Sequence, residues 1–455
     1  MNTRRHIRDQ RGSVLIVAML VTAMLALVLA SYFNLSLTSS RQTRRTFDRN
    51  TAFHLAEAGV EEAVWSYNQT LAGSTDAWRL WDTDGMAAWR RFNDFTLTSG
   101  STGSVKVYAS NTAPTGSTRP SIIAESTVET NTIGAATQMI EVTLRRRSFF
   151  SNGLTARRTL AFKGTNTSFD SWDSDPDRNP ATAPVDYSTA VRKDVNGIAS
   201  ASLDTTAVLV NQATVYGFVS TGGQFPKVGV NGLIGPFGTA PGTLDSTRVA
   251  TDFVANFPVF PAPTDGTYVS PLGTTLGTLG QTTRWRTPNI KLSGKQTLTI
   301  LGDVTLILTA PVGTSALDMA GTSSIIIPAG SNLTLYAEGD IKIAGQGLAN
   351  GNTQPASFKL WGTNTTETGQ SITLTGKGAL RAVVYSPNGD VALNGNGDMM
   401  GAVVARDITL TGNATYHYDS ALADLEDNAP YGPASWRLIT SSAERRSLSA
   451  HFQGW

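Results

Sequence analysis

The chain contains one acidic stretch whose residue types and spacing could bind a metal ion. It is Asp170-Ser-Trp-Asp-Ser-Asp-Pro-Asp-Arg-Asn179. Its carboxylates recur at alternate positions, as the oxygen ligands of calcium loops do. An EF-hand loop counted from Asp173 would need Gly at its sixth position and Glu at its twelfth, but Arg178 and Pro184 stand there. One hypothesis is a Ca²⁺ site with ligands Asp173, Asp175 and Asp177. The alternative, which we favour, is a solvated turn whose Asp side chains accept hydrogen bonds from backbone amides, with no cofactor.

Residues for other chemistry are sparse in this chain of 455 residues. It contains no Cys, which excludes disulfides, thiolate metal sites and cysteine nucleophiles, and it has only four His, of which His417 alone falls in the body. Neither a Gly-x-Ser-x-Gly elbow nor a Gly-Lys-Ser/Thr phosphate loop occurs. The remaining candidates for lyase or hydrolase chemistry are Asp390, Asp398, Arg406, Asp407 and Asp419. Several lie in turns, so we expect no catalytic residue and no enzyme unless they gather on one face.

The charge distribution argues against a nucleic-acid partner. Residues 1–45 hold seven Arg and one Asp, a net charge of +6, so the remaining 410 residues sum to −5. Affinity for a duplex rests on a basic face that neutralises phosphates. A mildly acidic body does not offer one.

The element that anchors the chain is an uncharged run of 21 residues, Ser13 to Phe33. As a helix it would span about 32 Å, close to the hydrocarbon thickness of a bilayer. The Arg residues before it favour a cytoplasmic N-terminus. We therefore expect a single-pass membrane anchor in contact with lipid, with the body outside the cytoplasm.

The helical pattern continues beyond the membrane segment. Small and apolar residues recur at steps of three and four, at Ala52, Phe53, Ala56, Gly59, Val60, Ala63, Val64 and Tyr67. This spacing places them on one face of an amphipathic helix. No Pro occurs from Ser13 to Asn68, so the sequence predicts one continuous helix over 13–73.

Two motifs on this helix carry a resemblance to a known family. The run Arg11-Gly12-Ser13-Val-Leu-Ile-Val17 and the later run Ala56-Glu57-Ala58-Gly59 resemble the N-terminal region of PilX-type minor pilins, which are low-abundance relatives of type IV pilus building blocks. The resemblance implies cleavage by a prepilin peptidase between Gly12 and Ser13, and packing of the helix against other pilin-like subunits. It also implies a bacterial inner-membrane protein whose body is periplasmic or displayed on a pilus. Major pilins carry Glu at the position of Val17. PilX-like proteins and K-type pseudopilins lack this Glu, as this chain does.

An internal repeat dominates the second half of the chain. Its template is apolar, any, apolar, small or polar, Gly, polar, and it begins at Ile290, Leu317, Ile341, Ile372, Val391 and Ile408. Short strands closed by Gly at a short period favour a β-solenoid over the alternative, a β-sandwich. Most of residues 165–425 is also similar to a C-terminal domain found in many PilX-like proteins, for which no activity is implied.

The sequence thus predicts a mainly β protein with one long N-terminal α-helix, and strands at 104–110, 121–130 and 137–147. The expected parts are a basic leader (1–12), the transmembrane and amphipathic helix (13–73), a pilin-like antiparallel sheet (74–150), a β-solenoid-like (β-helix-like) domain (151–425) with an insertion near 226–288, and a C-terminal tail (426–455). The expected function is that of a membrane-anchored minor pilin-like subunit. Two alternatives stay open: a K-type pseudopilin of a type II secretion system, or a surface β-helix protein that binds or processes polysaccharide.

Overall fold

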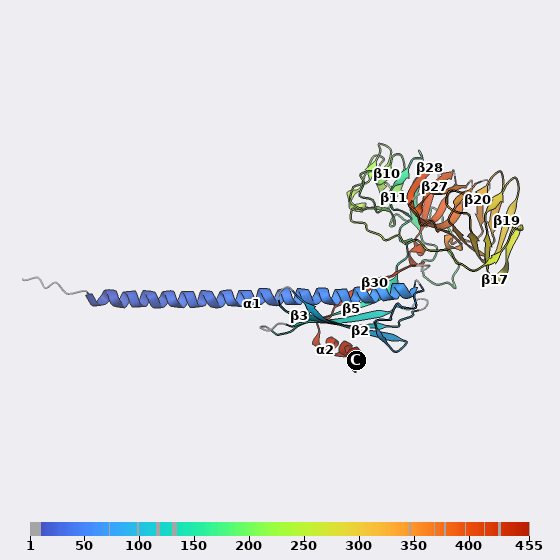
Figure 1. Cartoon of the computed structure of the whole chain (residues 1–455). Coiled ribbons are helices and arrows are strands. Elements are labelled where there is room, and N and C mark those ends of the chain that lie inside the picture. Colours follow the sequence, from blue (N-terminus) through green and yellow to red (C-terminus); the bar gives the residue numbers. More distant parts are fainter. Residues whose placement is uncertain are drawn as a thin grey trace, which may run out of the picture. The chain divides into compact units, whose positions relative to one another are not determined.

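The chain folds into two compact units, which the computed structural model in Figure 1 shows. The structure describes residues 11–71, 73–97, 100–114, 119–129, 134–344, 347–367, 369–376, 379–395, 397–413, 415–425 and 429–454. The first unit, here called the helix–sheet unit, comprises Met1–Arg146 and Pro430–Trp455. The second, here called the parallel-sheet unit, comprises Arg147–Ala429.

The helix–sheet unit begins with one unbroken helix, α1 (Arg11–Leu71), drawn in blue in Figure 1. The long N-terminal helix predicted from the sequence is therefore confirmed. Large apolar side chains along its N-terminal half are open to solvent; Val14, Leu20 and Leu27, for example, are 56–71% exposed. By length and composition α1 can cross a membrane, which fits a single-pass anchor.

The C-terminal half of α1 packs through small residues onto a sheet. Ala56, Ala63 and Tyr67 on the helix are fully buried, as are Val107, Ala124 and Val142 on the sheet. Gly59 lets the two surfaces meet, because a Cβ atom there would lie within 2.8 Å of Val105 and Val107 side-chain atoms. The predicted amphipathic face is the face that the sheet covers.

The sheet is antiparallel, with strand order β1-β2-β3-β4-β5-β30. Its strands are β1 (Asp82–Thr83), β2 (Ala87–Thr96), β3 (Thr102–Ser110), β4 (Ser121–Glu129), β5 (Ala136–Arg146) and β30 (Tyr431–Leu438). The three strands expected from alternation correspond to β3, β4 and β5.

Residues Pro430–Trp455 belong to this unit. The sequence instead predicts a separate C-terminal tail at 426–455. Strand β30 pairs with β5, and α2 (Ser442–Ser449) and η4 (Ala450–Phe452) follow it. Asn68 on α1 helps to hold β30 in place, because its side-chain amide donates to the Tyr431 carbonyl at 3.2 Å and accepts from the Tyr431 N–H at 2.7 Å. Phe452, next to the end of the chain, is buried with Ile123 and Met139 on the sheet face away from α1.

The parallel-sheet unit consists of strands that pair in parallel. Those up to residue 250 are β6 (Leu154–Ala156), β7 (Leu160–Phe162), β8 (Ser168–Trp172), β9 (Gly197–Ser200), β10 (Val208–Val210), β11 (Thr214–Tyr216), β12 (Phe218–Thr221), β13 (Lys227–Val228), β14 (Leu233–Gly235) and β15 (Val249–Ala250). Single 3-10 turns occur at η1 (Ser246–Arg248), η2 (Pro355–Ser357) and η3 (Ser420–Asp424).

The later strands complete the same sheet. They are β16 (Thr267–Tyr268), β17 (Thr275–Thr287), β18 (Ile290–Leu292), β19 (Thr297–Leu308), β20 (Ser315–Met319), β21 (Ser324–Ile327), β22 (Asn332–Ala337), β23 (Asp340–Ile343), β24 (Gly347–Asn350), β25 (Phe358–Gly362), β26 (Gln370–Gly376), β27 (Leu380–Gly395), β28 (Met399–Gly412) and β29 (Thr415–Asp419). Strands β13–β17 fall inside the insertion expected near 226–288, so this stretch contributes strands to the sheet, although most of its residues lie outside strands.

The internal repeat of the sequence is a ladder in the structure. The first apolar residues of its six copies pair strand to strand in the order Ile290, Leu317, Ile341, Ile372, Val391 and Ile408. All are at most 4% exposed, so they form one buried aliphatic column. Residues 345, 346, 377 and 396, which close three of the copies, lie outside the described residues.

The ladder continues into residues from the start of the unit. Ile408 pairs with Leu160, and Leu160 pairs with Val208. Residues Leu160-Ala-Phe-Lys-Gly164 thus form a further copy of the template, which sequence inspection missed. Strand β28 is flanked by β27 on one side and by β6 and β7 on the other. In Figure 1, β27 and β28 accordingly lie between the green β10–β11 and the yellow to orange β19–β20.

Candidate functional site

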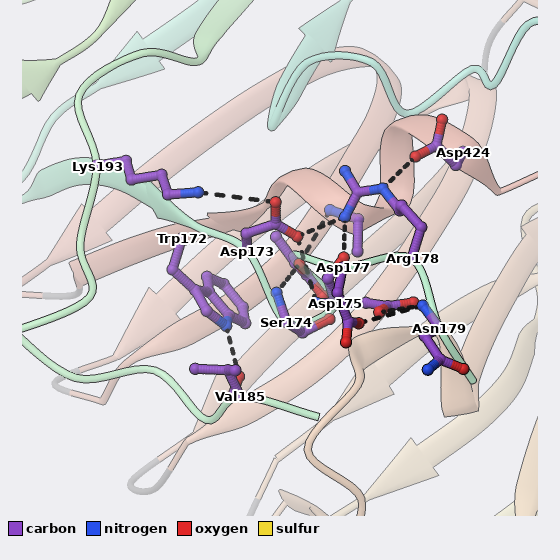
Figure 2. Close-up of polar contacts among 12 residues, drawn as sticks. Trp172, Asp173, Ser174, Asp175, Asp177, Arg178, Asn179, Val185, Lys193 and Asp424 are labelled. Atoms are coloured by element: carbon purple, nitrogen blue, oxygen red, sulfur yellow. Dashed lines mark hydrogen bonds and ion pairs between the residues drawn. The ribbon is translucent and has the colours of Figure 1, made fainter. Parts of the chain in front are cut away.

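The acidic stretch predicted from the sequence forms a loop directly after β8. Trp172, the last residue of that strand, is fully buried and donates from its indole N–H to the Val185 carbonyl at 3.2 Å, which brings the loop back to the strand. Asp173, the next residue, is mostly covered, with a side chain 12% exposed. Figure 2 shows the carboxylates of Asp173 and Asp424 joined to one cationic side chain.

That cation is Arg178. Its guanidinium donates to the Asp173 carboxylate at 2.7 Å, donates to the Asp175 carbonyl, and pairs with the Asp424 carboxylate of η3 at 2.7 Å. A second cation, the Lys193 ammonium, lies 3.7 Å from the other oxygen of Asp173. Asp173 and Asp424 are therefore paired with cations from within the chain.

The other two candidate ligands hold the turn itself. The carboxylates of Asp175 and Asp177 both accept from the Asn179 N–H at 3.2 Å, and Asp177 also accepts from the Thr182 hydroxyl at 3.0 Å. These are the backbone hydrogen bonds that the turn hypothesis requires. Within the described residues, no group of three or more His, Cys, Asp or Glu side chains is arranged to hold a metal ion.

The electrostatics of the site follow from these contacts. Burial acts to raise the pKa of Asp173, but the hydrogen bond and charge of Arg178, helped by Lys193, outweigh it and lower that pKa. The Thr182 hydroxyl lowers the pKa of Asp177. Asp419, at the end of β29, behaves in the opposite way: burial raises its pKa, although it accepts from the N–H groups of Ser174 at 2.9 Å and Ala421 at 3.1 Å.

A second polar cluster, which the sequence did not reveal, lies beside the loop. His417 on β29 bonds through Nδ1 to Asp170 on β8, because the two residues are register partners in neighbouring strands. The ring of Tyr187 stacks on the imidazole at 3.6 Å, and its hydroxyl donates to Asp170 at 2.8 Å. His417 Nε2 lies 3.9 Å from Asp398. His417 and Asp170 are each at most 5% exposed, so Tyr187 covers the pair.

A third cluster surrounds Arg406 on β28. Its guanidinium contacts the carboxylates of Asp390 and Asp407, with N–O distances of 2.9 and 3.2 Å from Nε. Glu367 joins this cluster through its carbonyl and pairs with Arg157 at 3.2 Å. Arg157 lines an open cavity of about 340 Å³ together with Asn388, Ala201, Ala255, Asn256, Phe257 and Val259. The five residues considered for catalysis are thus divided among three places.

The residues singled out on α1 also separate. Ala56 and Gly59 face the sheet, Glu57 Oε2 accepts from Nδ1–H of the His54 ring at 3.0 Å, and Ala58 is exposed. The proposed cleavage residues Gly12 and Ser13 lie within α1. Residues 1–10 of the expected leader are outside the described residues.

Comparison with known proteins identifies one segment. Residues 281–425 match a domain of unknown function (DUF7305). No curated protein matches the chain. Among solved structures, the competence-associated pilin ComZ from Thermus thermophilus is similar at 11% identity, with 86% of this chain and 98% of that chain covered and a TM-score of 0.19.

The DUF7305 segment runs from within β17 to just past η3. Arg406, with its partners Asp390 and Asp407, lies inside it, as do Glu367, His417 and Asp424. Three residues that pair with this segment precede residue 281: Arg157 pairs with Glu367, Asp170 with His417, and Arg178 with Asp424. The polar sites therefore depend on the docking of the early strands β6–β8 against the end of the DUF7305 segment.

Proposed function

We propose that this protein is a membrane-anchored minor pilin-like subunit of a type IV pilus or a related assembly, and that it presents its parallel-sheet unit outside the cytoplasm. The observation that carries the proposal is the continuity of α1. One unbroken helix leaves an apolar N-terminal half uncovered and packs its C-terminal half against an antiparallel sheet through Ala56, Gly59 and Ala63. The PilX-like motifs at residues 11–17 and 56–59 agree with this arrangement.

We propose further that the parallel-sheet unit is a β-solenoid. The copies of the repeat pair in register from Ile290 to Val208, and their apolar residues form continuous buried columns. A β-sandwich is built from antiparallel strands, whereas the named strands of this unit pair in parallel. The fold leaves the body with much strand and little helix, which also disfavours the helical body of a K-type pseudopilin.

The proposed role is assembly and display, not catalysis. The proposal is supported by the division of the five candidates: Asp390 lies with Arg406 and Asp407, whereas Asp398 lies near His417 and Asp419 lies at the acidic loop. Val17 has no carboxylate to pair with a neighbour's N-terminal amine in a filament core. The subunit is therefore expected at a pilus tip, in an initiation complex or as a rare insertion.

The first test of this function is processing. N-terminal sequencing of the protein from native membranes should begin at Ser13, because the Arg11-Gly12 junction directly precedes the apolar helix. A chain that still begins at Met1, in a host whose prepilin peptidase cleaves other pilins, would contradict the proposal.

The second test is assembly. Photocrosslinkers at Leu20 and Met24, which are 56% and 65% exposed on α1, should capture other pilin-like subunits in the membrane. The matched control is a crosslinker at Val254, which is 91% exposed but lies on the parallel-sheet unit. Quantitative mass spectrometry of sheared filaments should find the protein far below the major pilin. Equal stoichiometry would overturn the minor-subunit role, and the absence of any α1 crosslink would leave only a tethered β domain.

A further inference from the structure

In the acidic loop, Arg178 has a left-handed backbone conformation that glycine adopts more readily. Arg178 has a φ of +53°, in the left-handed region that side chains other than Asn and Asp rarely adopt. Among the described residues, the other non-glycine positions with positive φ are Asp94 and Asn111. Since the conformation gives Arg178 no local advantage, its side-chain contacts must account for it.

Those contacts place the guanidinium beside two of the residues considered as calcium ligands. Arg178 occupies the sixth position counted from Asp173, which is the glycine position of such loops. Its nitrogens meet oxygens from three chain positions: the carboxylate of Asp173, the carbonyl of Asp175 and the carboxylate of Asp424. The first two are the ligand positions that the sequence suggested for Ca²⁺, and a guanidinium now fills the space between them.

The same side chain also connects two distant parts of the sequence. Asp173 follows β8, and Asp424 lies in η3 after β29; the two strands are parallel neighbours with Trp172 paired to Asp419. Arg178 therefore ties the turn after one strand to the turn after the next. Without Arg178, the carboxylates of Asp173, Asp175, Asp177 and Asp424 would face Lys193 as the sole remaining cation of this group.

We propose that Arg178 is the resident cation of the acidic loop and acts through Asp424 as an ionic latch that holds residues 174–185 against η3. The loop closes by this latch without a divalent metal ion. High salt screens an ion pair of this exposure, so raising the ionic strength releases the latch.

The test is hydrogen exchange of the full-length protein in detergent, read by mass spectrometry on peptides from 174–185. The N–H groups of Asp175, Asn179 and Thr182 report on the loop, because each donates within it. Arg178→Gln and Asp424→Asn should each speed their exchange by about two- to fivefold. The control is Lys342→Gln, which removes a comparably exposed ion pair, 3.8 Å to Asp318, elsewhere in the unit.

Three further hydrogen-exchange measurements distinguish release of the latch from unfolding and from metal binding. Exchange in β8 and β29 should stay slow in Arg178→Gln, which separates release of the latch from unfolding. The wild-type loop should exchange at the same rate in EDTA and in CaCl₂, and faster in high NaCl. Unchanged exchange in Arg178→Gln would overturn the latch, and protection of the wild-type loop by CaCl₂ would show that a metal ion, not Arg178, is the resident cation.

Discussion

At the residue scale, Asp419 is a buried carboxylate that accepts hydrogen bonds but whose negative charge destabilises the fold. Its side chain accepts from the Ser174 and Ala421 N–H groups, yet burial raises its pKa. A raised pKa in an acid means that the ionised form is less stable in the folded chain than in the unfolded chain. The oxygen is thus needed, but the negative charge is not.

Substitutions of Asp419 should therefore separate the two roles. Asp419→Asn keeps an acceptor and removes the charge, so the free energy of unfolding at neutral pH should stay within about 1 kcal/mol of wild type or rise. Asp419→Ala leaves two buried N–H groups unpaired and should lose about 2–4 kcal/mol. Chemical denaturation of both variants measures the difference. An Asn variant as unstable as the Ala variant would mean that the charge is required.

Asp173 predicts a pH dependence of the opposite sign. Its pKa is lower in the folded protein than its ordinary value of 3.8, so its ionised form stabilises the fold. This contribution is complete at neutral pH and is lost as the pH falls below the ordinary value and through the lower folded value. The difference in unfolding free energy between wild type and Asp173→Asn should shrink over that acidic range. A difference that stays constant down to pH 2 would contradict it.

At the element scale, the glycine that closes the repeat at Ile408 controls how tightly neighbouring strands approach. Gly412, at the end of β28, has a φ of +91°, and a Cβ there would lie 2.3 Å from the Gly395 carbonyl oxygen of β27. The next contact is as tight, since a Cβ at Gly164 would lie 2.0 Å from the Gly412 oxygen. Gly412 therefore needs glycine for both space and conformation, whereas Gly164 needs it for space.

Alanine substitutions should distinguish the two requirements. Gly412→Ala should lower the free energy of unfolding by about 2–5 kcal/mol, through both left-handed strain and overpacking. The matched control is Gly330→Ala, since Gly330 has a φ of +77° with no atom within 4 Å of the added Cβ. It should lose only about 1–2 kcal/mol. Equal losses in calorimetry would mean that neighbouring strands move apart to accept the methyl group.

The elements that were predicted are those with local patterns. The absence of Pro and the spacing of Ala56, Val60 and Ala63 predict α1 and its buried face, and the repeats from Ile290 to Ile408 predict a ladder of strands. The copy at Leu160 was missed because it is separated by about 250 residues from Ile408, its partner, and only the fold brings them together. The same holds for Asp170 and His417.

The acidic loop shows where local reasoning ends. The sequence revealed the alternating carboxylates and the missing Gly at position 178, which favoured a turn over a metal site. It could not show that Arg178 forms an ion pair with Asp424, because Asp424 lies about 250 residues away in the sequence. Contacts between distant segments decided the chemistry at each of the three polar clusters.

At the scale of the whole molecule, the docking of the first strands against the last ones defines the folding unit. Strand β6 covers β28, with Leu154 paired to Val403, and both residues are at most 3% exposed. A fragment of residues 147–429 keeps this contact, whereas a fragment of 165–425 lacks β6 and β7. The boundaries suggested by family resemblance therefore cut into the core.

We expect the 147–429 fragment to be soluble and to unfold cooperatively on heating. The 165–425 fragment should aggregate or unfold at a lower temperature, because it exposes Val403 and the edge of β28. Size-exclusion chromatography and differential scanning calorimetry compare the two. Equal thermal midpoints would show that β6 and β7 are dispensable.

The insertion of one unit between β5 and β30 of the other has a consequence for survival after proteolysis. The chain passes between the units twice, after Arg146 and before Pro430, and β30 is then held by its pairing with β5 and by Asn68. A single nick in either crossing would leave the parallel-sheet unit attached through the other. Shedding would require two cuts, so the arrangement makes display of this unit tolerant of damage that would release a domain joined by one linker.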